Sequence, residues 1–243
     1  MRFGWMTSPL TRVLMARTQG SSRLTASQLA DALGADEYPD SDYDSDGAGG
    51  PGQGRGRGRG RGGPGAAPRP LGPVESLVRD VDACSTSAQC DAWCARYCVI
   101  DSKGNRRRLV RALARPSRAA GHALPSYARV TASLARVWPE VGTAVGAAVV
   151  QWCRKLRKAN DPSAAALEPR VRSARYLGEL TCFRCAPAGD VFRLLWSCLE
   201  GFHKHNVDVV CALLETCGRY LARLPETQQR LDAVVEEVRG RAR

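Results

Sequence analysis

The fold class is decided by the segment Val191-Phe192-Arg193-Leu194-Leu195-Trp196-Ser197-Cys198-Leu199-Glu200-Gly201-Phe202. Counted from Val191, apolar residues recur at i+3, i+4, i+7, i+8 and i+11, so they share one face of an α-helix. Gly189 and Asp190 precede the segment and are expected to supply the break and the N-cap. The spacing predicts an amphipathic helix that buries one stripe against neighbouring helices.

The same period continues on both sides of this segment. Asn206 is expected to cap a helix over residues 207–221, and Pro225 to open a last helix through residue 238. Upstream, it predicts helices over residues 74–81, 88–100, 106–113, 124–138, 141–156 after Pro139 and 171–180 after Pro169. We therefore predict an all-α fold of about nine helices. Short breaks favour stacked antiparallel hairpins, a HEAT-like solenoid, over an irregular bundle, although no sharp sequence repeat is visible.

Composition divides the 243 residues into two parts. Residues 1–73 are expected to be disordered, with an acidic segment at 36–46 and a Gly/Arg-rich linker at 47–73. Residues 74–243 form the folded candidate and carry 27 Lys and Arg against 17 Asp and Glu. No apolar run approaches the roughly 20 residues that span a bilayer, so no membrane role is expected. The ten Cys are interpreted as reduced thiols, and Cys90, Cys94 and Cys98 as one core stripe.

Basic residues form the best candidate for a functional surface. One cluster contains Lys103, Arg106, Arg107, Arg108, Arg111, Arg115 and Arg118, a second contains Arg154, Lys155, Arg157 and Lys158, and a third contains Arg170, Arg172 and Arg175. On a helix Arg108, Arg111 and Arg115 continue one face, which suits a phosphate backbone. In the linker, Arg55, Arg57, Arg59 and Arg61 alternate with Gly and can track phosphates or stack on bases. A solvated helix face, an acidic partner (such as the segment 36–46) and a plain spacer remain alternatives.

A small zinc or redox module is the alternative from another class. Cys182 and Cys185 have CxxC spacing, and His203 and His205 follow downstream, which supplies nitrogen and sulfur donors. Zinc is disfavoured because Cys198, the next cysteine along the chain, lies on an apolar stripe. A redox role is disfavoured because the all-helical pattern lacks the βαβ unit in which such motifs occur. No phosphate-binding loop, nucleophile elbow or HExxH motif is present, so neither an enzyme, a cofactor nor a small-molecule substrate is expected.

Six stretches carry a family resemblance: DSKGNRRRLVRAL at 101–113, LPSYAR at 124–129, VRSARYLGELT at 171–181, HKHN at 203–206, LLETCGRYL at 213–221 and PET at 225–227. In order and spacing they resemble the second middle domain, of the translation initiation factor 4G type, in the up-frameshift suppressor two family. The resemblance implies a stack of HEAT-like hairpins within a scaffold of nonsense-mediated mRNA decay. The CxxC pair is not part of the family pattern, and the chain is expected to end one helix short of a complete domain.

The resemblance also implies partners and a location. The expected partners are RNA and proteins of mRNA decay or of the exon junction. The expected location of the protein is the cytoplasm, in the region around the nucleus. Within such scaffolds the second middle domain looks like a structural spacer, so the resemblance carries no partner-binding residue over to this chain.

Overall fold

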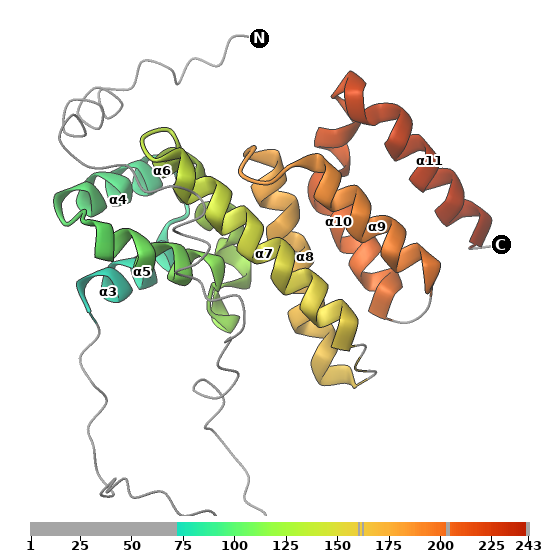
Figure 1. The fold of residues 1–243 in the computed structure, drawn as a ribbon, viewed down its shortest axis with the longest axis horizontal. Coiled ribbons are helices and arrows are strands. Elements are labelled where there is room, and N and C mark those ends of the chain that lie inside the picture. The colour runs from blue at the N-terminus through green and yellow to red at the C-terminus, as the bar shows by residue number, and fades with distance from the viewer. Residues whose placement is uncertain (1–71, 160, 162, 203–204, 242–243) are drawn as a thin grey trace, which may run out of the picture.

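The computed structural model describes residues 72–159, 161, 163–202 and 205–241, and these ranges contain helices and no strand (Figure 1). The α-helices are α3 (Pro73–Arg79), α4 (Ser87–Val99), α5 (Lys103–Ala114), α6 (Leu124–Ala135), α7 (Pro139–Ala159), α8 (Ala164–Cys182), α9 (Ala188–Glu200), α10 (His205–Ala222) and α11 (Pro225–Arg241). Two 3-10 helices, η2 (Asp80–Ala83) and η3 (Arg118–Ala123), join them. The predicted all-α fold is confirmed. The predictions for residues 1–71 lie outside the described residues.

The helices pack as two parallel layers. From α3 onward each helix contacts the helix two places later in the chain, so α3, α5, α7, α9 and α11 form one layer and α4, α6, α8 and α10 the other. Contacts between the layers join successive helices, chiefly α6 with α7, α7 with α8 and α9 with α10. In Figure 1 the chain accordingly advances from α3 at one end to α11 at the other. This is the arrangement of stacked helical hairpins.

Helix starts follow local capping. Thr86 and Gln89 form a reciprocal capping box at the start of α4. Ser102 accepts a hydrogen bond from the backbone N–H of Asn105, so α5 begins one turn before the predicted residue 106. The prediction that a helix starts after Pro169 is wrong, because α8 begins at Ala164 and contains this proline.

Two predicted N-caps are also wrong. Asp190 lies inside the first turn of α9, which begins at Ala188 after Pro187. Asn206 lies inside α10, and its side-chain amide donates a 2.6 Å hydrogen bond to the carbonyl oxygen of Gly201. Asp190 instead pairs with Arg154 and Arg193, and Asn206 bonds the C-cap residue of α9.

The core runs continuously between the two layers. Leu109 and Leu113 of α5, Tyr127 and Leu134 of α6 and Leu195 of α9 are almost completely buried. Cys90 and Cys94 are buried as predicted, and Cys98 packs against the core from a partly buried position. Because each apolar stripe packs against the next hairpin, most charged residues lie on the outer faces of the stack.

Candidate functional site

The outward face of α5 is a basic surface. Its inner face buries Leu109, Val110 and Leu113, which fixes the rotation of the helix. Arg107, Arg108, Arg111 and Arg115 are exposed on the other side. Since α5 contains no acidic residue, this face presents positive charge without a neighbouring carboxylate on its own helix. We call Arg107, Arg108, Arg111 and Arg115 the α5 basic face.

Arg106 does not belong to this face, and its placement there by the sequence analysis is wrong. Its side chain is only 1% exposed, because position 106 falls on the inner stripe of α5. Its Nε lies 3.0 Å from Oδ1 of Asp101, and its guanidinium lies 3.5 Å from Oε1 of Glu140 and 5.1 Å from the ring centre of Trp138. Arg106 therefore joins α5 to α7 inside the protein and cannot contact a surface ligand.

Beyond α5, ion pairs connect η3 to α8. Arg118 lies 3.7 Å from Glu168, and the same carboxylate lies 3.5 Å from Arg172. The guanidinium of Arg172 lies 5.6 Å from the ring centre of Trp152 on α7. Part of the third basic cluster is thus occupied in contacts between helices.

The second basic cluster occupies the C-terminal end of α7. Arg154, Lys155 and Lys158 are exposed, whereas Arg157 is half-buried. Arg154 lies 3.2 Å from Asp190 of α9, so it points toward α9. Positive side chains in the last turn also compensate the negative end of the helix dipole.

The candidate zinc ligands are not brought together. Cys182 ends α8, while the His205 ring lies 3.0 Å from the carbonyl oxygen of Ser163 just before α8. A helix of 19 residues separates the two ends by about 28 Å at 1.5 Å per residue. Burial raises the pKa of Cys182 to about 11 and that of Cys185 to about 12, which disfavours the thiolate that zinc requires.

No group of three or more His, Cys, Asp or Glu in the described residues is placed to hold a metal ion. His203, the fourth candidate ligand, and the linker residues Arg55, Arg57, Arg59 and Arg61 lie outside the described residues. Within the described residues no helix is both long and apolar enough to cross a membrane.

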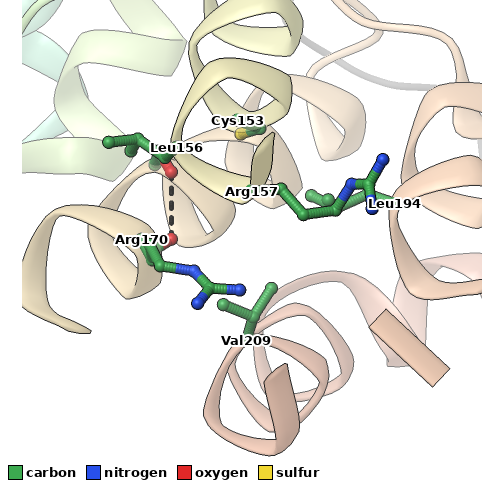
Figure 2. A pocket seen from close by; sticks show the side chains of 7 residues that line it. Cys153, Leu156, Arg157, Arg170, Leu194 and Val209 are labelled. Carbon is green, nitrogen blue, oxygen red and sulfur yellow. Dashed lines mark hydrogen bonds between the residues drawn. The ribbon is translucent and has the colours of Figure 1, made fainter. Parts of the chain in front are cut away.

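A small pocket among the later helices was not predicted from the sequence. It lies among α7, α8, α9 and α10 and is lined by Cys153, Leu156, Arg157, Arg170, Ser173, Leu194 and Val209 (Figure 2). Arg170 had been grouped with surface charges, but it is buried, like Arg106. The spacing of residues along α8 could have predicted this burial. Ala174 and Leu177 follow Arg170 at i+4 and i+7, so Arg170 shares the inner stripe of the helix.

Two layers of stacked hairpins with charged outer faces define a protein of the α-helical solenoid class. The pattern of the MIF4G domain matches residues 108–240, and the chain belongs to this family. It is 35% identical over 162 residues to "Regulator of nonsense transcripts UPF2" of Arabidopsis thaliana, an alignment covering 67% of this chain and 14% of that protein. It is 29% identical over 171 residues to the human "Regulator of nonsense transcripts 2", covering 68% and 13%.

A third similar protein is "Nonsense-mediated mRNA decay protein 2" of Schizosaccharomyces pombe. It is 29% identical over 141 residues, covering 57% of this chain and 13% of that protein. The aligned part of the chain thus spans about one seventh of the length of these relatives. The matched region contains α6 to α10 and most of α5 and α11, so it includes most of the α5 basic face.

Proposed function

We propose that this chain is a non-enzymatic scaffold domain of nonsense-mediated mRNA decay, acting in the cytoplasm. The names of its relatives from a plant, an animal and a fungus support the pathway, since all three refer to nonsense transcripts or their decay. The stacked hairpins support the scaffold role, because they hold outer faces in fixed relative positions without a catalytic centre. The partners we propose are RNA and proteins of mRNA decay or of the exon junction.

The pathway assignment is tested by domain replacement. In the Arabidopsis relative, the aligned segment is exchanged for residues 72–241 of this chain, and the half-life of a reporter mRNA with a premature stop codon is measured in cells lacking that relative. We expect the reporter to remain short-lived, as with the intact relative. A half-life as long as that with the segment deleted, at equal protein level, would contradict the assignment.

We further propose that the α5 basic face contacts RNA phosphates. The observation that carries this proposal is the exposure of Arg108 and Arg111 on α5, a helix that contains no acid, and of Arg115 at its C-cap. Neutralising phosphates releases counterions, so removing one arginine–phosphate pair lowers the slope of log affinity against log salt by about 0.7 for a single strand. A solvated helix face or a spacer would show no such dependence on these particular residues.

The RNA contact is tested by fluorescence anisotropy of labelled single-stranded RNA with the full chain, over a salt series. Arg108→Glu/Arg111→Glu is compared with Arg219→Glu/Arg223→Glu, which removes the same charge from exposed positions near the end of α10. We expect a weaker affinity and a slope smaller by about 1.4 only for the first variant. If both variants lost the same RNA affinity and salt slope, net charge alone would explain the binding, and the α5 contact would be contradicted.

A third variant separates the linker from the helical stack. If replacement of Arg55, Arg57, Arg59 and Arg61 by Gln abolishes RNA binding while the α5 variant binds normally, the α5 contact is wrong. The decay scaffold assignment would be unaffected, because the domain replacement tests it alone.

A further inference from the structure

The α5 basic face and the acidic segment 36–46 carry opposite charges within one chain. Residues 36–46 contain six carboxylates and no basic residue, and they lie outside the described residues. The arginines of the α5 basic face are exposed, and α5 itself contains no acid. Oppositely charged regions of this density attract each other, most strongly at low ionic strength. The acidic segment is therefore a candidate occupant of the α5 basic face.

Two carboxylates that lie beside α5 are already paired inside the protein. Asp101, just before α5, lies 3.0 Å from the buried Arg106, and Glu140 of α7 lies 3.5 Å from the same guanidinium. Arg106 points inward, away from the α5 basic face. The charges of Asp101 and Glu140 are thus compensated in the interior, and the positive charge of the α5 basic face stays on the outside.

The chain between the two charged regions is long enough to bring them together. Residues 47–72 are rich in Gly and lead directly into α3 at Pro73. A Gly-rich chain of 26 residues has an end-to-end distance of roughly 28 Å. Helix α3 packs directly against α5, which is only about 18 Å long (Figure 1). The acidic segment can therefore reach the whole α5 basic face.

The arginines of the linker compete for the same carboxylates, but pairing with them costs more entropy. Arg55, Arg57, Arg59 and Arg61 alternate with Gly, and glycine loses more conformational freedom on ordering than any other residue. The backbone of α5 is already ordered by the fold, so its arginines are held in place before the acidic segment arrives. This difference favours the α5 basic face over the linker.

The spacing of the charges also matches. Along the axis of α5, Arg111 lies about 4.5 Å from Arg108 and about 6 Å from Arg115. The aspartates of residues 40–46 occupy every second position, and an extended chain places such residues about 6.7 Å apart on one side. The long arginine side chains cover the remaining difference. Each arginine can therefore meet one carboxylate, and guanidinium–carboxylate pairs form strong hydrogen bonds.

We propose that the acidic segment 36–46 docks on the α5 basic face of its own chain, where its carboxylates take the place of RNA phosphates. Because the segment is tethered, its effective concentration at this face is in the mM range. That concentration occupies about half of the molecules even if the contact has a Kd of only about 1 mM between separate molecules. The inference rests on the face that we propose as the RNA contact, and it adds a competitor for that face, but docking itself requires no RNA.

Docking is tested in the full chain, without RNA, by paramagnetic relaxation in NMR spectra. A nitroxide label is attached through a non-natural amino acid that replaces Tyr43, because the chain contains ten cysteines that would also react with a thiol label. The readout is the loss of backbone amide intensity along α5, compared with the loss along α10. We expect a larger loss along α5 at low salt, and its disappearance at about 1 M salt, where the Debye length is about 3 Å.

Variants separate docking from tethering and from net charge. Asp40→Asn/Asp42→Asn/Asp44→Asn/Asp46→Asn keeps the tether and removes the charge, so the intensity loss along α5 is expected to vanish. Arg108→Glu/Arg111→Glu is expected to abolish it as well, whereas the matched Arg219→Glu/Arg223→Glu on exposed positions of α10 keeps it. Adding Asp42→Arg/Asp44→Arg to Arg108→Glu/Arg111→Glu exchanges the charges and is expected to restore the loss.

Three results would overturn the proposal. These are equal intensity losses along α5 and α10 in the unchanged chain, an undiminished loss after the aspartates are neutralised, and abolition of the loss by both arginine variants alike. The RNA contact is judged separately, because no RNA is present in these spectra. A chain that shows the expected losses but binds no RNA through α5 would contradict only the RNA contact.

Discussion

The hydroxyl group of Tyr176 on α8 donates a 2.8 Å hydrogen bond to the carbonyl oxygen of Leu113 on α5. Leu113 lies in the last turn of α5, where carbonyl groups lack a partner within the helix. The ring of Tyr176 also meets that of Tyr127 edge to face, with 6.4 Å between ring centres, and the hydroxyl of Tyr127 donates to Asp82 at 2.8 Å. Buried tyrosines thus connect η2, α5, α6 and α8 across the two layers.

We predict that Tyr176→Phe lowers the free energy of unfolding by about 1–2 kcal/mol. The change keeps the ring but leaves the buried carbonyl of Leu113 without its donor. Urea denaturation followed by circular dichroism measures the difference. Tyr220→Phe is the control, because its hydroxyl makes no hydrogen bond within the described residues, and a change below about 0.5 kcal/mol is expected. Equal destabilisation by both variants would contradict the role of the Tyr176 hydroxyl.

Arg106→Met is predicted to destabilise the fold by about 3–5 kcal/mol, because it leaves the carboxylates of Asp101 and Glu140 in the interior without their shared cation. The neighbouring Arg107→Met, on the exposed side of α5, is expected to stay within about 0.5 kcal/mol of the unchanged chain. Chemical denaturation of the two variants side by side measures this contrast. An Arg106→Met protein as stable as Arg107→Met would show that the buried pair contributes no stability.

Glu179→Gln is predicted to stabilise the protein at pH 7 and to lose this effect as the pH falls. Burial raises the pKa of Glu179 above its ordinary value of about 4.5, so the folded state holds a proton more tightly than the unfolded state. Glu179 therefore contributes to the free energy of unfolding below pH 4, where it is protonated in both states. This contribution is lost as the pH rises through the pKa that Glu179 has in the folded state. Glutamine does not ionise, so the Glu179→Gln variant keeps this part of the unfolding free energy at pH 7.

The measurement for Glu179→Gln is the difference in unfolding free energy from the unchanged chain at pH 3.5 and pH 7. Glu215→Gln is the control, since Glu215 is exposed and lies 3.7 Å from Arg175; a change of less than about 0.5 kcal/mol is expected at either pH. A gain for Glu179→Gln that is the same at both pH values would rule out titration of this carboxyl as its cause.

The helices were predictable because their apolar residues recur with the helical period, and periodicity is a local property. The stripe that begins at Val191 is buried in α9 as predicted as far as Leu199, whereas Phe202 lies beyond the helix end and is partly buried. The start of α8 was missed because Pro169 was taken as a boundary, yet α8 continues through this proline in its second turn, without the backbone hydrogen bond that a residue with an N–H would make there. The N-cap assignments failed because α9 and α10 begin before Asp190 and Asn206, so both residues lie inside the first turns.

Charge clusters were less predictable than helices, since a run of arginines does not reveal which side chains turn inward. Arg106 precedes Leu109, Val110 and Leu113 at i+3, i+4 and i+7, so its register already placed it on the buried stripe. Its partner Glu140 lies on α7, and only the stacking of α5 on α7 brings the two together. The pocket with Arg157 and Arg170 likewise depends on four helices meeting.

Two glycines are predicted to respond oppositely to replacement by alanine. Gly146 of α7 faces the turn between α8 and α9, where an added Cβ would collide with the backbone carbonyl of Cys185. Since this contact is with backbone, the helices must separate, and Gly146→Ala is expected to cost about 1–3 kcal/mol. Gly104 of α5 has no atom within 4 Å of an added Cβ, and alanine there favours the helix by about 0.5–1 kcal/mol. Thermal and urea unfolding of both variants measure the sign of the change in unfolding free energy. Stabilisation by Gly146→Ala would show that α7 does not approach this turn so closely.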